Sequence, residues 1–141
     1  MRQNKIFQNK KYIITNILLF ALLYLSVIFN KEYIRPNYNN TEIIGIITGS
    51  FSNFMAAYII SLFSVSPLLA SKIKTKKARI IFYTISVIVF ILLMIEELKP
   101  FVDASKTYDI YDILASGLGS LFAILTFEVF FNKIIIRREK L

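Results

Sequence analysis

The chain has 141 residues, of which 56% are hydrophobic and 18% charged, and its formal net charge is +8. It has no cysteine and no histidine, which excludes disulfides, thiolate metal sites, cysteine nucleophiles and histidine general bases. We therefore expect no resident metal or cofactor, and the high apolar fraction favours a membrane protein over a soluble domain.

Four long apolar segments follow one another along the chain. They cover residues 12–30, 43–69, 78–95 and 110–132. A bilayer core about 30 Å thick is crossed by about 20 apolar residues in a helix. The segments predict an all-α fold, in which residues 1–141 form a single membrane domain of four transmembrane helices. No small-residue cleavage site follows the first segment, so we interpret it as a retained helix rather than a signal peptide.

Basic and acidic residues lie in different connecting segments. The N-terminal tail, the 71–79 loop and the C-terminal end carry most of the lysines and arginines, and the other two loops carry most of the acids. The positive-inside rule then places both termini and the 71–79 loop in the cytoplasm. Because topology explains the basic charge, we expect membrane lipids and no nucleic acid as partners. The 71–79 loop is either a solvated orienting loop or a contact with anionic headgroups.

A group of charged residues lies between the third and fourth segments, on the outer side in this topology. Its members are Glu96, Lys106, Asp109 and Asp112. Charge beside hydrocarbon is costly and therefore indicates a function. One aspartate can cap the fourth helix, but capping requires only one of them. We interpret the group as a ligand-binding pocket, and the enzyme question stays open.

Small and polar residues on the predicted helices indicate where helices approach closely. Gly45 and Gly49 have small-xxx-small spacing, which lets a second helix pack against them. Gly117 and Gly119 are likewise expected to let another helix pack closely against the fourth segment.

Two further polar residues are candidates for supporting the charged group. Asn53 lies one turn beyond Gly49 on the same face, where its amide either bonds across the bundle or reaches the charged group. Ser116 shares a helix face with Asp109 and Asp112, at i+7 from the first of them.

Glu128 is an acid inside the fourth apolar segment. We expect it to pair with Lys133 or to accept a hydrogen bond from Asn16. A proton relay is disfavoured because the segments contain no second deep ionisable residue.

The block 96–119 resembles the signature of the VanZ-like family, small multi-span bacterial membrane proteins named after a teicoplanin-resistance protein. Glu96, Asp109, Asp112 and Gly119 match its glutamate, aspartates and glycine. The departures are Lys99 for glutamine, Lys106 for arginine and Ser116 for asparagine. Lysine cannot make the planar two-pronged contact of arginine, so only a point-charge attraction is expected from Lys106.

The resemblance implies a multi-pass protein of the bacterial plasma membrane that acts on glycopeptide tolerance or on envelope glycans and lipids. Carboxylates accept hydrogen bonds from sugar hydroxyls, and a lysine can meet a phosphate. Two alternatives remain. Glu96, Asp109 and Asp112 are candidate catalytic groups of a membrane hydrolase with paired carboxylates, or ligands of a divalent ion. A small transporter is the other alternative if several copies assemble.

Overall fold

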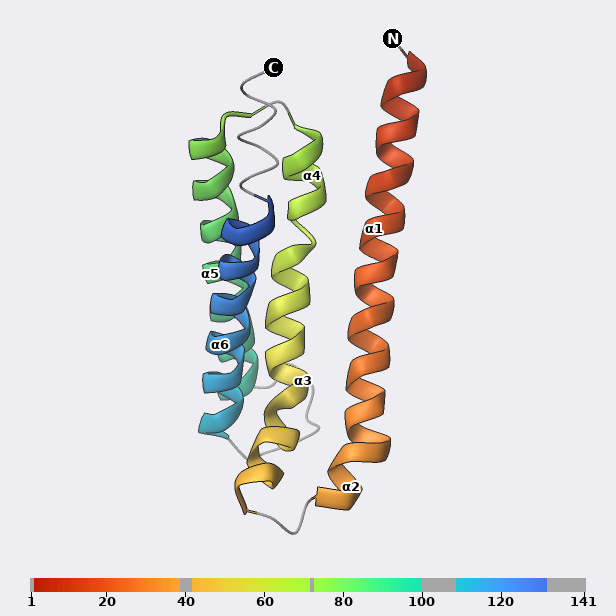
Figure 1. The fold of residues 1–141 in the computed structure, drawn as a ribbon. Helices are drawn as coiled ribbons and strands as arrows, with labels where there is room; N and C mark the ends of the chain where they lie inside the picture. Colours follow the sequence, from red (N-terminus) through yellow and green to blue (C-terminus); the bar gives the residue numbers. More distant parts are fainter. Residues whose placement is uncertain (1, 39–41, 72, 100–108, 132–141) are drawn as a thin grey trace.

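The computed structural model describes the backbone of residues 2–38, 42–71, 73–99 and 109–131. These residues form helices and no strand, which confirms the predicted all-α fold. Four helical stretches are long and apolar enough to cross a membrane: Ile13–Tyr38, Ile43–Ala70, Thr75–Leu98 and Ile110–Phe131. Figure 1 shows them running side by side along one axis.

The first helical stretch extends further than the apolar segment. It consists of α1 (Arg2–Phe29), a π-helical segment η1 (Asn30–Ile34) and α2 (Arg35–Tyr38). In η1 the Arg35 N–H donates to the Asn30 carbonyl five residues earlier. Pro36, which follows at once, has no N–H to donate to the preceding turn. The π-helical turn of η1 therefore lies directly before the proline that interrupts the α-helical hydrogen-bond pattern.

The second stretch, expected as one helix over 43–69, is broken into α3 (Glu42–Leu62) and α4 (Val65–Ala70). The break lies at Phe63 and Ser64. Pro67 lacks the N–H that would donate to the Phe63 carbonyl in a continuous helix. Instead, the Ser64 N–H and hydroxyl both donate to the Ser61 carbonyl, at 3.3 and 2.8 Å.

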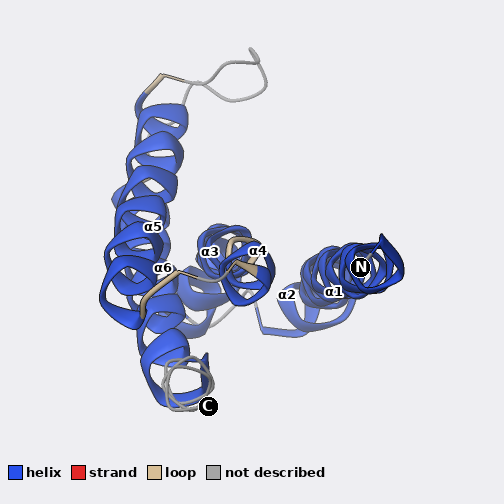
Figure 2. Ribbon diagram, turned by 90° about the horizontal axis from the view of Figure 1, so that it is seen from above, coloured by secondary structure: helices blue, strands red, loops and turns tan. Residues whose placement is uncertain are grey.

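The third and fourth stretches are α5 (Thr75–Leu98) and α6 (Ile110–Thr126), the latter continued by a π-helical segment η2 (Phe127–Phe131). Seen from above, α3 and α4 lie between the α5–α6 pair and α1 (Figure 2). The start of α1, the residues between α4 and α5, and the end of α6 lie at one end of the bundle (Figure 1). The end of α5 and the start of α6 lie at the other. We call these the basic end and the acidic end.

Small residues form the contact between α3 and α6. Ala57, Ser61 and Ala123 are fully buried, and Gly119 is buried as well. A Cβ added at Gly119 would overlap the Phe54 carbonyl oxygen and lie 3.0 Å from the Ala57 Cβ. The absence of a side chain at Gly119 therefore sets how closely α6 approaches α3.

Two of the other expected packing glycines, Gly49 and Gly117, differ from Gly119. A Cβ added at Gly49 would meet no atom within 4 Å. At Gly117 it would meet the Phe90 ring at 3.4 Å, an ordinary contact. Gly45 lies on α3 and is half-buried.

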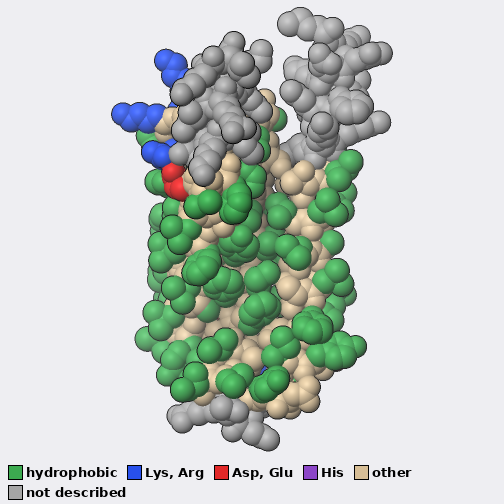
Figure 3. Space-filling view, viewed as in Figure 1, with side chains coloured by type: hydrophobic (Ala, Val, Ile, Leu, Met, Phe, Trp, Pro, Cys, Tyr) green, Lys and Arg blue, Asp and Glu red, His purple; other side chains and the backbone are tan. Residues whose placement is uncertain are grey.

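Apolar side chains cover the flanks of the molecule (Figure 3). The helix containing α1 has the least burial: 6% of its apolar window lies inside the protein, against 28% for the last helix. Leu62, Leu68, Phe82 and Phe127 belong to the main apolar core, towards the basic end. Within it the Phe82 and Phe127 rings stack with centroids 4.3 Å apart. The exposed apolar flanks suit a protein surrounded by lipid.

Candidate functional site

Asp109 caps α6 at the acidic end. Its backbone is extended, and its Oδ1 accepts a hydrogen bond from the Tyr111 N–H at 2.9 Å. The first turn also has a bond from the Asp112 N–H to the Asp109 carbonyl, at 3.2 Å. A side-chain acceptor at this position satisfies a donor that the helix cannot pair. Of the two aspartates that the sequence offered for capping, Asp109 makes the cap contact.

Glu97 links the end of α5 to the start of α6. Its Oε1 accepts a hydrogen bond from the Asp109 N–H at 3.1 Å. Its carboxylate also lies close enough to Asp109 and Asp112 for their charges to repel one another. Glu97 was not among the predicted site residues, whereas its neighbour Glu96 was.

Helical spacing could not have identified Glu97. The buried residues of α5 are Ala78, Phe82, Ser86 and Val89. Continued in steps of three and four residues, that spacing reaches Glu96 as readily as Glu97. In the structure, Glu97 is half-buried and Glu96 is exposed.

The other predicted site residues take different positions around this end. Asp112 is half-buried in the first turn of α6. Ser116 is buried, and its hydroxyl donates to the Asp112 carbonyl at 3.0 Å. Asn53 is half-buried on α3. Lys106 lies outside the described residues. Within the described ranges, no hydrogen bond links Asn53 or Ser116 to a carboxylate of the site.

An apolar groove lies between α3 and α6, and the acids of the junction are not among its lining residues. Its volume is about 440 Å³, within the range of small-molecule sites. Tyr111 lines its outer part, so the residue whose N–H is held by Asp109 also contributes to the groove. The remaining lining residues are Ile46, Ile47, Ser50, Phe51, Phe54, Leu114, Ala115 and Leu118.

Chemically, this end offers carboxylate acceptors beside an apolar surface. Of the four acids at the junction of α5 and α6, Asp109 and Glu97 each accept a backbone hydrogen bond, whereas Glu96 and Asp112 accept none from the described residues. In the part of the chain that the structure describes, no three acidic side chains are grouped so as to hold a metal ion. The arrangement therefore suits acceptance of hydrogen bonds, or attraction of a cation, from a ligand with an apolar part.

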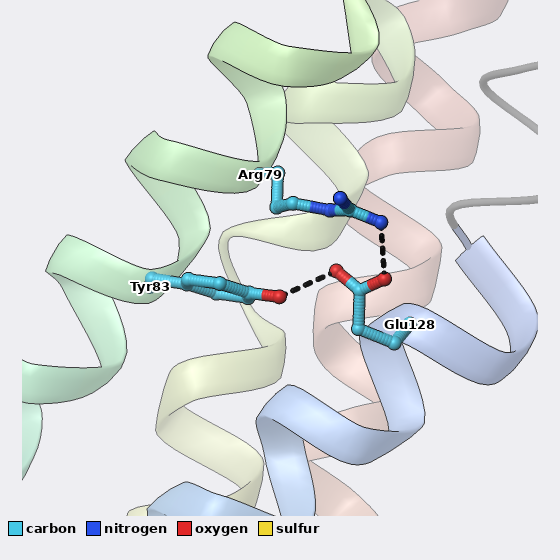
Figure 4. A network of polar contacts seen from close by, with 3 residues as sticks. All are labelled: Arg79, Tyr83 and Glu128. Atoms are coloured by element: carbon cyan, nitrogen blue, oxygen red, sulfur yellow. Dashed lines mark hydrogen bonds and ion pairs between the residues drawn. The ribbon is translucent and has the colours of Figure 1, made fainter.

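A second polar group lies near the basic end, where α5 and η2 meet. Arg79 Nη2 donates to Glu128 Oε2 at 2.5 Å, and the Tyr83 hydroxyl donates to Glu128 Oε1 at 2.6 Å. Figure 4 shows the three side chains pointing towards one another from the two helices. Two donors thus hold the carboxylate, one on each oxygen, which offsets the cost of placing it among apolar helices.

These contacts differ from the partners expected for Glu128. The structure shows Arg79 and Tyr83 on this carboxylate; the Asn16 Oδ1, an acceptor that could not bond to it, is buried without a hydrogen-bond partner in the described part of the chain. Lys133 lies outside the described residues. The sequence pattern placed Arg79 in the basic 71–79 loop. In the structure Arg79 belongs to α5, and its side chain points towards α6, where it reaches Glu128.

Comparison with protein-family models, characterised proteins and solved structures found no match for this chain. The fold itself defines the class: an all-helical protein whose four apolar helices are those of a multi-pass membrane protein.

Proposed function

We propose that this chain is a VanZ-like protein of the bacterial plasma membrane with both termini in the cytoplasm. Its outward-facing acidic end binds an envelope glycan, a lipid headgroup or a glycopeptide-type ligand. The observation that carries the proposal is the junction of α5 and α6. There, Glu97 and Asp109 hold the two helix ends together beside the remaining carboxylates, and Tyr111 in the same turn of α6 lines the groove between α3 and α6.

The hydrogen bonds divide the acids into two roles. Asp109 and Glu97 fix the junction, because each accepts a backbone N–H. Glu96 is exposed and Asp112 is half-buried in the first turn of α6. In the proposed function, these two contact the ligand, with Lys106 as a point charge for a phosphate or carboxylate. Asn53 and Ser116 support the site from the helices below it.

Substitution of the two ligand-facing acids tests this function. We expect Glu96→Gln and Asp112→Asn, expressed in a teicoplanin-susceptible bacterium, to lose at least part of the tolerance that the unaltered chain confers. Glu32→Gln is the matched control, because Glu32 is an exposed acid on η1 at the same end of the bundle. The readout is the minimum inhibitory concentration, with membrane levels of each variant measured by immunoblot. Full tolerance in both variants at normal protein levels would overturn the proposal.

The same variants distinguish binding from hydrolysis. An acid–base pair loses its chemistry when either carboxylate becomes an amide. A binding site keeps part of its affinity because the contacts in the groove remain. We therefore expect graded losses in the single variants and a larger loss in the double variant. Complete loss in each single variant would instead indicate a hydrolase.

A further inference from the structure

The basic end carries a cluster of cations that the proposed function does not use. Lys74, Lys76 and Lys77 are exposed, and the Arg79 side chain is 43% exposed. Figure 3 shows basic side chains projecting at this end, with an acidic side chain directly beneath them. The charge of this cluster is therefore partly balanced by Glu128 and otherwise available to an anion.

A groove in the apolar surface lies between α5 and α6, further along these helices from the cluster. It has a volume of about 270 Å³, and its lining residues include Ser86, Phe90, Gly117 and Ile124. On α5, the spacing from Arg79 through Tyr83 to Ser86 keeps these residues on one face. On α6 and η2, Glu128, Ile124 and Gly117 are likewise spaced by four and seven residues. The groove therefore lies below the Arg79–Glu128 pair.

Arg79 keeps donor capacity for an anion. Its Nη2 is engaged by Glu128, and its Nε is buried, so neither of these atoms is the contact proposed for a ligand. The side chain is nevertheless 43% exposed, and a phosphate oxygen is a strong acceptor for the exposed part of a guanidinium.

We propose that an anionic phospholipid binds along α5 and α6 at the basic end, with its phosphate at Lys76 and Arg79 and an acyl chain in the groove over Gly117. Charge and shape select this occupant together. The cations require an anionic headgroup, and the groove below them is lined by apolar surface, which fits hydrocarbon. The Glu128 carboxylate, which also accepts from the Tyr83 hydroxyl, holds the guanidinium in place beside the headgroup.

Two adjacent lysines provide a matched test of the headgroup contact. Lys76 shares the groove face with Arg79 and Tyr83, whereas Lys77 points about 100° further around the helix. Both are exposed and carry the same charge. We expect Lys76→Gln to weaken binding of phosphatidylglycerol about fivefold, and Lys77→Gln to leave it nearly unchanged. Equal weakening in both variants would indicate diffuse attraction to the membrane surface and would overturn the site.

Two glycines provide the matched test of the acyl-chain contact. Gly117→Leu places a side chain in the groove next to Phe90. Gly49→Leu adds the same side chain to α3 at a position with no atom within 4 Å of the added Cβ. We expect the first to abolish the gain in thermal stability given by phosphatidylglycerol and the second to keep it. Retention of the gain in Gly117→Leu would refute the acyl-chain placement.

The measurement uses the full chain in a non-ionic detergent. Unfolding is followed by circular dichroism while phosphatidylglycerol, phosphatidylcholine with the same acyl chains, or inorganic phosphate is added. Native mass spectrometry counts the lipids retained. We expect phosphatidylglycerol alone to raise the melting temperature substantially. An equal rise with phosphatidylcholine or with inorganic phosphate would overturn the proposal. If Gly117→Leu does not fold, the two lysine variants still decide whether the phospholipid binds at this site.

Discussion

At the scale of single residues, Glu128 shows how a carboxylate is accommodated among apolar helices. Each of its oxygens accepts from a donor on α5, Arg79 or Tyr83. Hydrogen bonds to charged groups contribute about 1.5–3 kcal/mol each. The pair thus fastens the end of α6 to the start of α5, at a point where the helix has changed to π-helical geometry.

We expect Arg79→Gln and Glu128→Gln each to lower the free energy of unfolding by about 1.5–3 kcal/mol. The double variant should lose less than the sum of the two, because the residues interact directly. The measurement is unfolding in detergent followed by circular dichroism. Arg35→Gln is the control, an exposed arginine on α2, with an expected change within about 0.5 kcal/mol. Additive losses in the double variant would show that the pair is not coupled.

Gly119 gives a second prediction at this scale. We expect Gly119→Ala to destabilise the protein by about 1–3 kcal/mol, because the added methyl group overlaps the Phe54 carbonyl and forces α6 away from α3. Gly49→Ala is the control, since the added Cβ meets nothing within 4 Å and alanine favours the helix. The same unfolding measurement applies. Similar stabilities for the two variants would show that the α3–α6 contact does not depend on this glycine.

The sequence indicated some of these residues and not others. Capping of α6 by an aspartate followed from its place before an apolar helix, and the structure assigns it to Asp109. The contact between Arg79 and Glu128 could not be predicted, because it joins residues 49 positions apart. It depends on how α5 and α6 are rotated about their own axes, which the composition of the two segments does not define.

At the scale of helices, proline accounts for the two departures from the expected spans. Pro36 lies next to the π-helical turn of η1, and Pro67 accompanies the break between α3 and α4. Apolar composition predicts that a segment crosses the membrane, because length and hydropathy decide crossing. Apolar composition does not reveal where a proline, which has no N–H, leaves the carbonyl four residues earlier without its helical hydrogen bond.

Asn30 links the first helix to the rest of the bundle. Its Nδ2 donates to the Thr48 carbonyl on α3 at 2.7 Å, and its side chain is buried. We expect Asn30→Ala to cost about 1 kcal/mol and to speed amide hydrogen exchange in η1 and α2. Asn37→Ala is the matched control, because Asn37 donates to Tyr33 within its own helix and is exposed.

The exchange experiment also has a clear negative result. Because opening is local when few contacts cross a boundary, exchange in α5 and α6 should stay unchanged in Asn30→Ala. Uniformly faster exchange in all helices would show that Asn30 supports the whole bundle, and an effect of equal size in Asn37→Ala would show that the Thr48 contact is unimportant.

At the scale of the whole molecule, the two ends of the bundle define the orientation to be tested. Lys74 lies at the basic end, immediately before α5, and Lys99 follows α5 at the acidic end. The chain has no cysteine, so single cysteines report their own position. In intact cells we expect a membrane-impermeant maleimide to label Lys99→Cys, and to label Lys74→Cys only after lysis. The reverse pattern would invert the orientation and remove the acidic end from the envelope side.

The low burial of the first helix has a consequence for how the protein is made. The first helix leaves the ribosome before the other three, and only 6% of its apolar window is buried inside the protein. It therefore can enter the bilayer as an independent unit. In contrast, the small-residue face of α3 around Ala57 matches Gly119 on α6, which is synthesised after α3 and α5. Assembly of α3 must consequently wait until α6 has been made, so the central helix reaches its final contacts later than its place in the chain suggests.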